Sequence, residues 1–214
     1  MKRKVAARLT TGSRLYGIDL PESDFDTVTV YYPTVREMLG MERFKRIGGD
    51  RSEYTLLDIA NLLLKGAPNI WELLFVTPEE TSSEWRMLCA MRDALWTDRQ
   101  ASATLGFIHG HTKDIERKKD EESWNTKKGA SVLRWWYQLT AYLRKGTITF
   151  PFDKCHTDAL LAVRSGEVSY DDWKHVCTFY KIMLSPVEGT FTVDQAKELM
   201  ELYLRELFHF AEGK

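Results

Sequence analysis

The sequence predicts an α+β protein with a small mixed sheet near its N-terminus, flanking helices and a mostly α-helical remainder. Two β-type runs, 4–9 and 27–32, fall in the first fifty residues, and the second is β-branched and aromatic throughout. From residue 57 onward, apolar side chains recur with the helical period instead. We expect a core domain at 1–96 and a helical domain at 97–214.

Local patterns predict the elements in order. A short turn at 11–17 and a polar loop at 20–23 separate the two strands, and Thr34 can cap a helix over 35–41. We expect a turn at 47–50, then a strand from residue 51 that passes into a helix near Asp58. Asn69 and either Ser82 or Ser83 can cap later helices. Further amphipathic stretches cover 57–64, 70–74, 83–95, 99–118, 127–145, 157–165, 170–184 and 193–211.

Composition excludes several classes of protein. Apolar residues make up 43% and charged residues 29%, and 30 basic against 31 acidic residues give a net charge of −1. A disordered chain, a collagen-like fibre and a polybasic chromatin-type binder are therefore excluded. Three scattered cysteines without a CxxC pair indicate neither a disulfide framework nor a zinc site. No stretch is apolar enough to span a membrane, so we expect a cytoplasmic protein, in the host cytoplasm if phage-encoded.

Two short motifs carry the chemistry. Gly12 and Ser13 follow the first strand, where a bare backbone, N–H groups and a hydroxyl suit the oxygens of a triphosphate. Asp24 and Asp26 open the second strand, whose alternation turns both carboxylates to one face. Their repulsion raises at least one pKa unless a cation such as Mg²⁺ lies between them. Together the motifs predict a metal–nucleotide site.

These motifs resemble the signature of the DNA polymerase β-like nucleotidyltransferase superfamily. The resemblance is nearest to bacterial and phage predicted nucleotidyltransferases, some linked by name to RNA repair, and it covers most of residues 8–175. It rests on Gly12 to Gly17 with Pro21 to Asp26, and extends over 53–59, 64–75, 127–146 and 148–151. This chain has Ala67 where the group often has Asn, and Ser131 where we align a His.

The resemblance implies transfer of a nucleoside monophosphate from an NTP, ATP among them, to an acceptor hydroxyl, with release of pyrophosphate. Asp24 and Asp26 would bind Mg²⁺ or Mn²⁺, and Glu53 would be the third catalytic and metal-binding carboxylate, with Asp50 and Asp58 as rivals. The acceptor would be an RNA end (tRNA-like), a protein or a small molecule.

Gly12 and Ser13 would hold the β,γ-phosphates, and Arg14, Lys127 and Arg134 are further candidate phosphate contacts. Lys127 and Arg134 are seven residues apart and therefore share a helix face. We expect that face to look into the cleft. The alternative is two solvated cations on an amphipathic helix.

Two other functions remain open. One is a catalytically weak nucleotide-binding or antitoxin-like module that acts through a protein partner, which an incomplete acidic site would favour. The other is an RNA-binding or RNA-end-modifying protein whose helical part grips a tRNA-like acceptor, which a strong salt dependence of RNA binding would favour.

Overall fold

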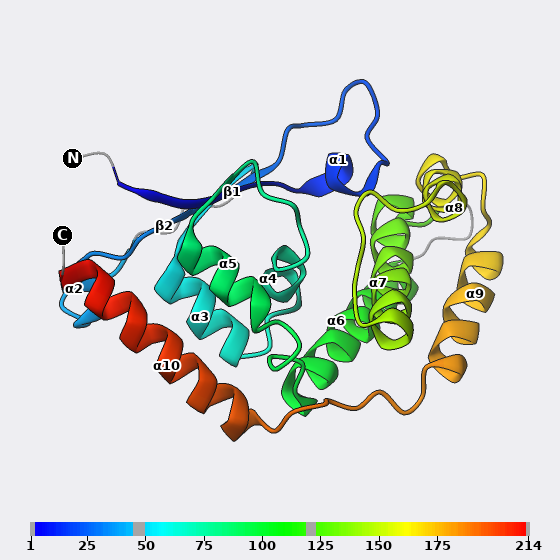
Figure 1. Cartoon of the computed structure of the whole chain (residues 1–214). Helices are drawn as coiled ribbons and strands as arrows, with labels where there is room; N and C mark the ends of the chain where they lie inside the picture. The colour runs from blue at the N-terminus through cyan, green and yellow to red at the C-terminus, as the bar shows by residue number, and fades with distance from the viewer. Residues whose placement is uncertain (1–2, 45–49, 119–122, 213–214) are drawn as a thin grey trace.

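The computed structural model describes residues 3–44, 50–118 and 123–212 (Figure 1). The strands are β1 (Val5–Thr10), β2 (Thr27–Tyr31), β3 (Arg51–Thr55) and β4 (Glu80–Thr81). The helices are α1 (Gly12–Tyr16), α2 (Val35–Met38), α3 (Leu56–Leu64), α4 (Pro68–Leu73), α5 (Ser83–Ala90), α6 (Asp98–Lys118), α7 (Thr126–Lys145), α8 (Lys154–Ser165), α9 (Tyr170–Met183) and α10 (Val193–Glu212). The predicted α+β class is confirmed. The turn predicted at 47–50 lies, apart from Asp50, outside the described residues.

The sheet is mixed, in the order β3-β2-β1-β4. β1 runs antiparallel to both β2 and β4, whereas β2 and β3 are parallel. Side chains alternate between the two faces, so Leu9 and its partner Val28 are buried while Arg8 between the β1 core positions is exposed. Figure 1 shows α3 and α5 beneath β1 and β2. The sheet is therefore covered by helices on its apolar face.

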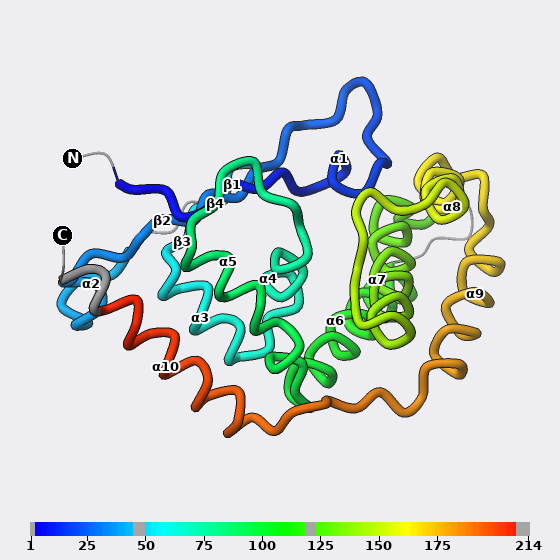
Figure 2. Tube along the Cα trace, in the orientation of Figure 1, coloured from blue at the N-terminus to red at the C-terminus, as the bar shows by residue number. Residues whose placement is uncertain are grey.

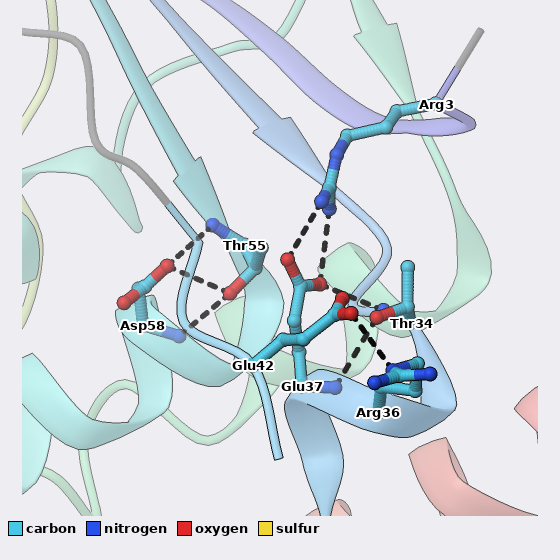
Figure 3. A network of polar contacts seen from close by, with 7 residues as sticks. All are labelled: Arg3, Thr34, Arg36, Glu37, Glu42, Thr55 and Asp58. Atoms are coloured by element: carbon cyan, nitrogen blue, oxygen red, sulfur yellow. Dashed lines mark hydrogen bonds and ion pairs between the residues drawn. The ribbon is translucent and has the colours of Figure 1, made fainter. Parts of the chain in front are cut away.

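Side-chain caps begin α2 and α3, the helices that follow β2 and β3 (Figure 3). Thr34 and Glu37 form a capping box at α2, and Arg3 holds the Glu37 carboxylate from the other side with two hydrogen bonds of 3.0 and 2.6 Å. Thr55 ends β3 and caps α3, where the Asp58 carboxylate accepts from the Thr55 backbone N–H at 3.0 Å. The Asp58 carboxylate is thus committed to a helix start.

Several predicted boundaries need correction. α4 starts at Pro68 with Ala67 as its N-cap, not after Asn69, because proline suits the first helical position, where its missing N–H costs nothing. α2 ends at Met38, and α5, capped by Ser82, ends at Ala90 instead of continuing to residue 95. The sequence does not predict β4, because two residues carry no measurable alternation.

An aromatic cluster joins the N-terminal part to the helical part. The rings of Trp71 (α4), Trp96 and Tyr142 (α7) lie with centroids 4.7 to 4.8 Å apart in all three pairings. Trp71 and Trp96 are fully buried, so this contact fixes α7 against the core.

The last helix returns to the first part of the chain. α10 packs against α2, α3 and α5, as the red segment of Figure 2 shows beside the cyan one. The predicted division at residues 96 and 97 stays a prediction, but α10 lies with the N-terminal elements. No helix in the described part of the chain is both long and apolar enough to cross a membrane.

Candidate active site

A tight backbone bend at Gly12 brings the two motifs together. The Thr11 N–H donates to the Asp26 carbonyl at 2.9 Å, which extends the β1–β2 pairing by one step to the start of α1. Gly12 has a φ of +69°, and a Cβ placed there would lie 1.9 Å from Asp26 Oδ2. The Asp26 carboxylate therefore lies directly against bare backbone, which only glycine permits.

Gly12→Ala is expected to lower transfer activity at least tenfold, because the methyl group must push the Asp26 carboxylate aside. The positive φ adds a loss of about 1–2 kcal/mol in unfolding free energy. Gly40→Ala is the matched control, since Gly40 has a φ of +71° with nothing within 4 Å of its Cβ position. Steady-state rates and chemical denaturation of both variants measure the two effects. Equal activity loss in both variants would contradict the contact.

The bend and the paired acids line one cleft of about 470 Å³. One wall carries Gly12, Ser13, Asp24 and Asp26, and β2 begins one residue after Asp26, so both acids precede the strand. The opposite wall is α7. Its cleft residues are Lys127, Ala130, Ser131 and Arg134, which follow the helical repeat. The expected convergence of the cationic face of α7 on the acids is therefore present.

The carboxylate of Asp26 lies in an environment that disfavours its charged form. Partial burial, and next the negative charges of Asp50 and Asp24, raise the pKa of Asp26, while the nearby Lys127 ammonium acts against the rise. The repulsion of Asp26 by the other two acids is therefore larger than its attraction to the Lys127 ammonium. An oxygen-rich set with surplus negative charge fits a hard divalent cation, for which Asp24, Asp26 and the Ser13 hydroxyl are suitable donors.

The three candidates for the third carboxylate occupy different places. Glu53 does not line the cleft. It pairs in register with Thr29, and its carboxylate accepts from the Tyr31 hydroxyl at 3.1 Å. This places Glu53 on the face of the sheet opposite to the buried Val28.

Asp50 does not line the cleft either, but it lies close enough to Asp26 for its charge to act on that carboxylate. The Asp50 carbonyl accepts from the Thr27 N–H at 2.8 Å. Asp58 caps α3. Within the described residues no three His, Cys, Asp or Glu side chains are already gathered closely enough to hold a metal.

Comparison with known proteins decides the family. The family model described as "RlaP: RNA repair pathway DNA polymerase beta family" matches residues 2–170. The chain belongs to the RlaP family. A search of curated proteins gave no match. A solved nucleotidyltransferase-like protein from Exiguobacterium sibiricum 255-15 is 12% identical, over 96% of this chain and 69% of that one, with a TM-score of 0.30.

Family and fold make this RlaP-family chain a polymerase β-like nucleotidyltransferase. The match includes the Gly12-Ser13 bend, both acids of the cleft and the whole of α7. It ends as α9 begins, so α9 and α10 lie outside the family model.

In this RlaP-family chain Arg134 lines the cleft and also forms a buried ion pair with Glu72. Its Nη1 donates to both carboxylate oxygens of Glu72, at 2.8 and 3.0 Å, and both residues are buried. The Tyr16 hydroxyl and the Gln138 amide also donate to Glu72, at 2.5 and 3.1 Å. Burial acts to lower the pKa of Arg134, but the Glu72 carboxylate outweighs it and holds the pKa above its ordinary value. Glu72 thus neutralises Arg134.

Arg14 does not line the cleft. Its guanidinium lies over the Phe25 ring at 5.3 Å and donates to the Ser23 carbonyl at 3.4 Å. Arg14 therefore braces the loop between the motifs, and the geometry does not support its predicted contact with phosphate.

Sequence reasoning missed Arg164 and Glu72. Arg164, at the end of α8, lines the cleft and donates to the Ile18 carbonyl at 2.9 Å. Nothing in the spacing of the sequence links positions 146 residues apart. Glu72 did leave a signal, because it is a lone charge in an apolar helical run and a buried charge needs a partner.

Proposed function

We propose that this chain is a metal-dependent nucleotidyltransferase that moves a nucleoside monophosphate from an NTP to a hydroxyl at an RNA end, releasing pyrophosphate. The observation that carries the proposal is the cleft in which Asp24 and Asp26 face the Gly12-Ser13 bend, with Lys127 opposite. The family description, which names RNA repair, supports RNA as the acceptor.

The residues present fit the reaction. Asp24 and Asp26 would hold Mg²⁺ or Mn²⁺, which when bound supplies positive charge to the phosphoryl oxygens. The backbone N–H groups of the bend and the Ser13 hydroxyl donate to the β,γ-phosphates, and the Lys127 ammonium offsets their charge. The acceptor oxygen bonds to the α-phosphorus as the bond to the pyrophosphate oxygen breaks. A neighbouring carboxylate takes the acceptor's proton.

We assign the third carboxylate to Asp50 in place of Glu53. Asp50→Asn is expected to lower transfer roughly a hundredfold, the scale of a lost proton acceptor. Glu53→Gln makes the same carboxylate-to-amide change on the other face of the sheet, where it meets Tyr31, and should leave the rate within about twofold. Initial rates across a Mg²⁺ titration measure both variants. A large loss in the Glu53 variant with a near-normal Asp50 variant would reverse the assignment.

One observation favours a second candidate function. The described residues hold no preassembled three-ligand site, which suits a catalytically weak nucleotide-binding module that acts through a protein partner. Such a module would bind NTP without consuming it.

The test is incubation of the whole chain with each α-labelled NTP, Mg²⁺ or Mn²⁺, and either total RNA or a protein extract, followed by gel separation. Labelled RNA that disappears on chelation of the metal is the expected result. Label on protein alone would overturn the RNA acceptor. NTP binding without any labelled product would favour the weak module.

A further inference from the structure

A second hollow lies on the other side of the first turn of α7. It is a shallow groove of about 470 Å³ between α6 and α7, and we call it the α6 groove. Lys127 lines the active-site cleft, and Lys128, the next residue, lines the α6 groove. The charge of Arg134 acts on His111 in the groove, so the two hollows are close neighbours. An RNA strand that leaves the cleft over the start of α7 would therefore enter the α6 groove.

The floor of the groove is unusually bare. Gly106 and Gly110 lie four residues apart in the interior of α6, on one face of that helix. Glycine is among the least favourable residues at such positions. At neither glycine would a Cβ meet any atom within 4 Å, so no packing contact in the described structure requires their small size. What the two glycines do provide is exposed backbone that a ligand can approach closely.

Basic side chains lie on the same face of α6 as the two glycines. Lys113 and Arg117 follow Gly106 and Gly110 at helical spacing, and Lys128 faces them from α7. Among the residues that the structure describes, Asp114 is the acidic one that lines the groove, and Lys128, Arg117 and Lys118 all pair with it. Hydrogen bonding from Lys128, with the other cations, lowers the pKa of Asp114 to about 2. The groove therefore keeps a cationic surplus although the whole chain carries a net charge of −1.

We propose that the α6 groove binds the phosphodiester backbone of the acceptor strand and leads it to the cleft, with Lys113, Arg117 and Lys128 on phosphates. This rests on the proposed function, and it names where the acceptor binds. A stripe of glycines alone could equally accept an apolar helix. The cations beside it favour a polyanion as the ligand of the groove. Phe107 and His111, whose rings lie 4.2 Å apart, border the glycine floor on the side of α7.

The test measures binding of a short fluorescein-labelled single-stranded RNA to the full chain by anisotropy, without NTP. Lys113→Gln with Arg117→Gln should weaken binding roughly tenfold at low salt, and should reduce the slope of log K against log salt by about 1.4. Lys197→Gln with Arg205→Gln on α10 makes the same change in charge on another exposed surface and should leave the affinity unchanged.

A second variant tests the glycine floor without risk to the helix. Gly106→Glu places bulk and negative charge in the groove, yet glutamate is the better helix former, so the thermal midpoint should not fall. We expect a loss of RNA affinity in Gly106→Glu and near-normal affinity in Gly106→Ala. The proposal would be overturned if the Lys113→Gln with Arg117→Gln variant and the Gly106→Glu variant both bound RNA as tightly as the wild type. A wild type that binds no RNA would also overturn it.

The outcomes separate this inference from the proposed function. Failure of the wild type to label any acceptor would count against transfer, whereas the comparison of RNA affinities still decides the groove. NTP binding with Mg²⁺, measured by calorimetry, should be the same in the wild type and the groove variants. A change in oligomeric mass on Gly106→Glu, with RNA affinity unchanged, would assign the groove to self-association and overturn the proposal.

Discussion

Asp26→Asn is expected to abolish transfer, with a loss of at least about a thousandfold, while leaving the protein folded. Several kcal/mol of transition-state stabilisation would be lost with the cation that Asp24 and Asp26 share, and each 1.36 kcal/mol is a factor of about ten in rate. Pyrophosphate release and labelled product both measure the effect. Asp19→Asn, an exposed change outside the cleft, is the control and should retain activity.

The Asp26→Asn variant should also be more stable than the wild type when no divalent cation is present. Burial and the neighbouring Asp50 and Asp24 raise the pKa of Asp26 in the folded state above its unfolded value of about 3.9. Between these two pKa values the folded state binds more protons than the unfolded state. Stability therefore falls as pH rises from about 4 through the folded pKa, and the loss is fully present at neutral pH.

Thermal midpoints across pH test this reasoning. Asp26→Asn should exceed the wild type at about pH 7, and the difference should close below about pH 4, where both side chains are neutral. Adding Mg²⁺ should raise the midpoint of the wild type and not that of the variant. An Asp26→Asn variant that transfers at the wild-type rate, or a wild type that Mg²⁺ does not stabilise, would refute the assignment of the acids.

Glu72→Gln is expected to cost about 3–5 kcal/mol of unfolding free energy, because it leaves Arg134 charged, buried and without its counter-ion. The double variant Glu72→Leu with Arg134→Met should recover part of that loss, since it removes the unpaired buried charge, while the Tyr16 hydroxyl and the Gln138 amide still lose their acceptor. Denaturant titrations of both variants give the two free energies.

The double variant also decides what Arg134 does. Because Glu72 neutralises it, we expect Arg134 to hold α7 against α1 through Tyr16, and Lys127 to supply the charge felt by phosphate. KM for NTP in the double variant should then stay within a few-fold of the wild-type value. A KM that remains more than about tenfold higher, in a protein of partly restored stability, would show instead that Arg134 contacts the triphosphate, as the sequence predicted.

Much of the site could be read from the sequence because its central parts are local. Gly12 and Ser13 follow a strand end, and Asp24 and Asp26 stand two residues apart just before another strand, so their closeness along the chain places both acids at one strand start. The helical repeat likewise put Lys127 on one face of α7 with Arg134. These predictions required only the geometry of single elements.

The choice among distant carboxylates could not be made in this way. Glu53 lies on the face of the sheet opposite to Val28 because β2 and β3 pair in parallel with Thr27 opposite Arg51, whereas Asp50 is close enough to Asp26 for its charge to act there. A slip of one residue would have exchanged the faces. Arg164 depends similarly on the packing of α8, which no spacing reports.

The sequence by itself therefore determined the α+β class, the order of the elements apart from β4, and the two local motifs, the small-residue bend and the acid pair, since each follows from the pattern of a few neighbouring residues. The tertiary structure alone decided which face of the sheet each distant carboxylate occupies, which cation is neutralised and where a second basic groove opens beside the cleft. Those outcomes depend on strand register and helix packing, which are set by the burial of the whole core and not by any one segment.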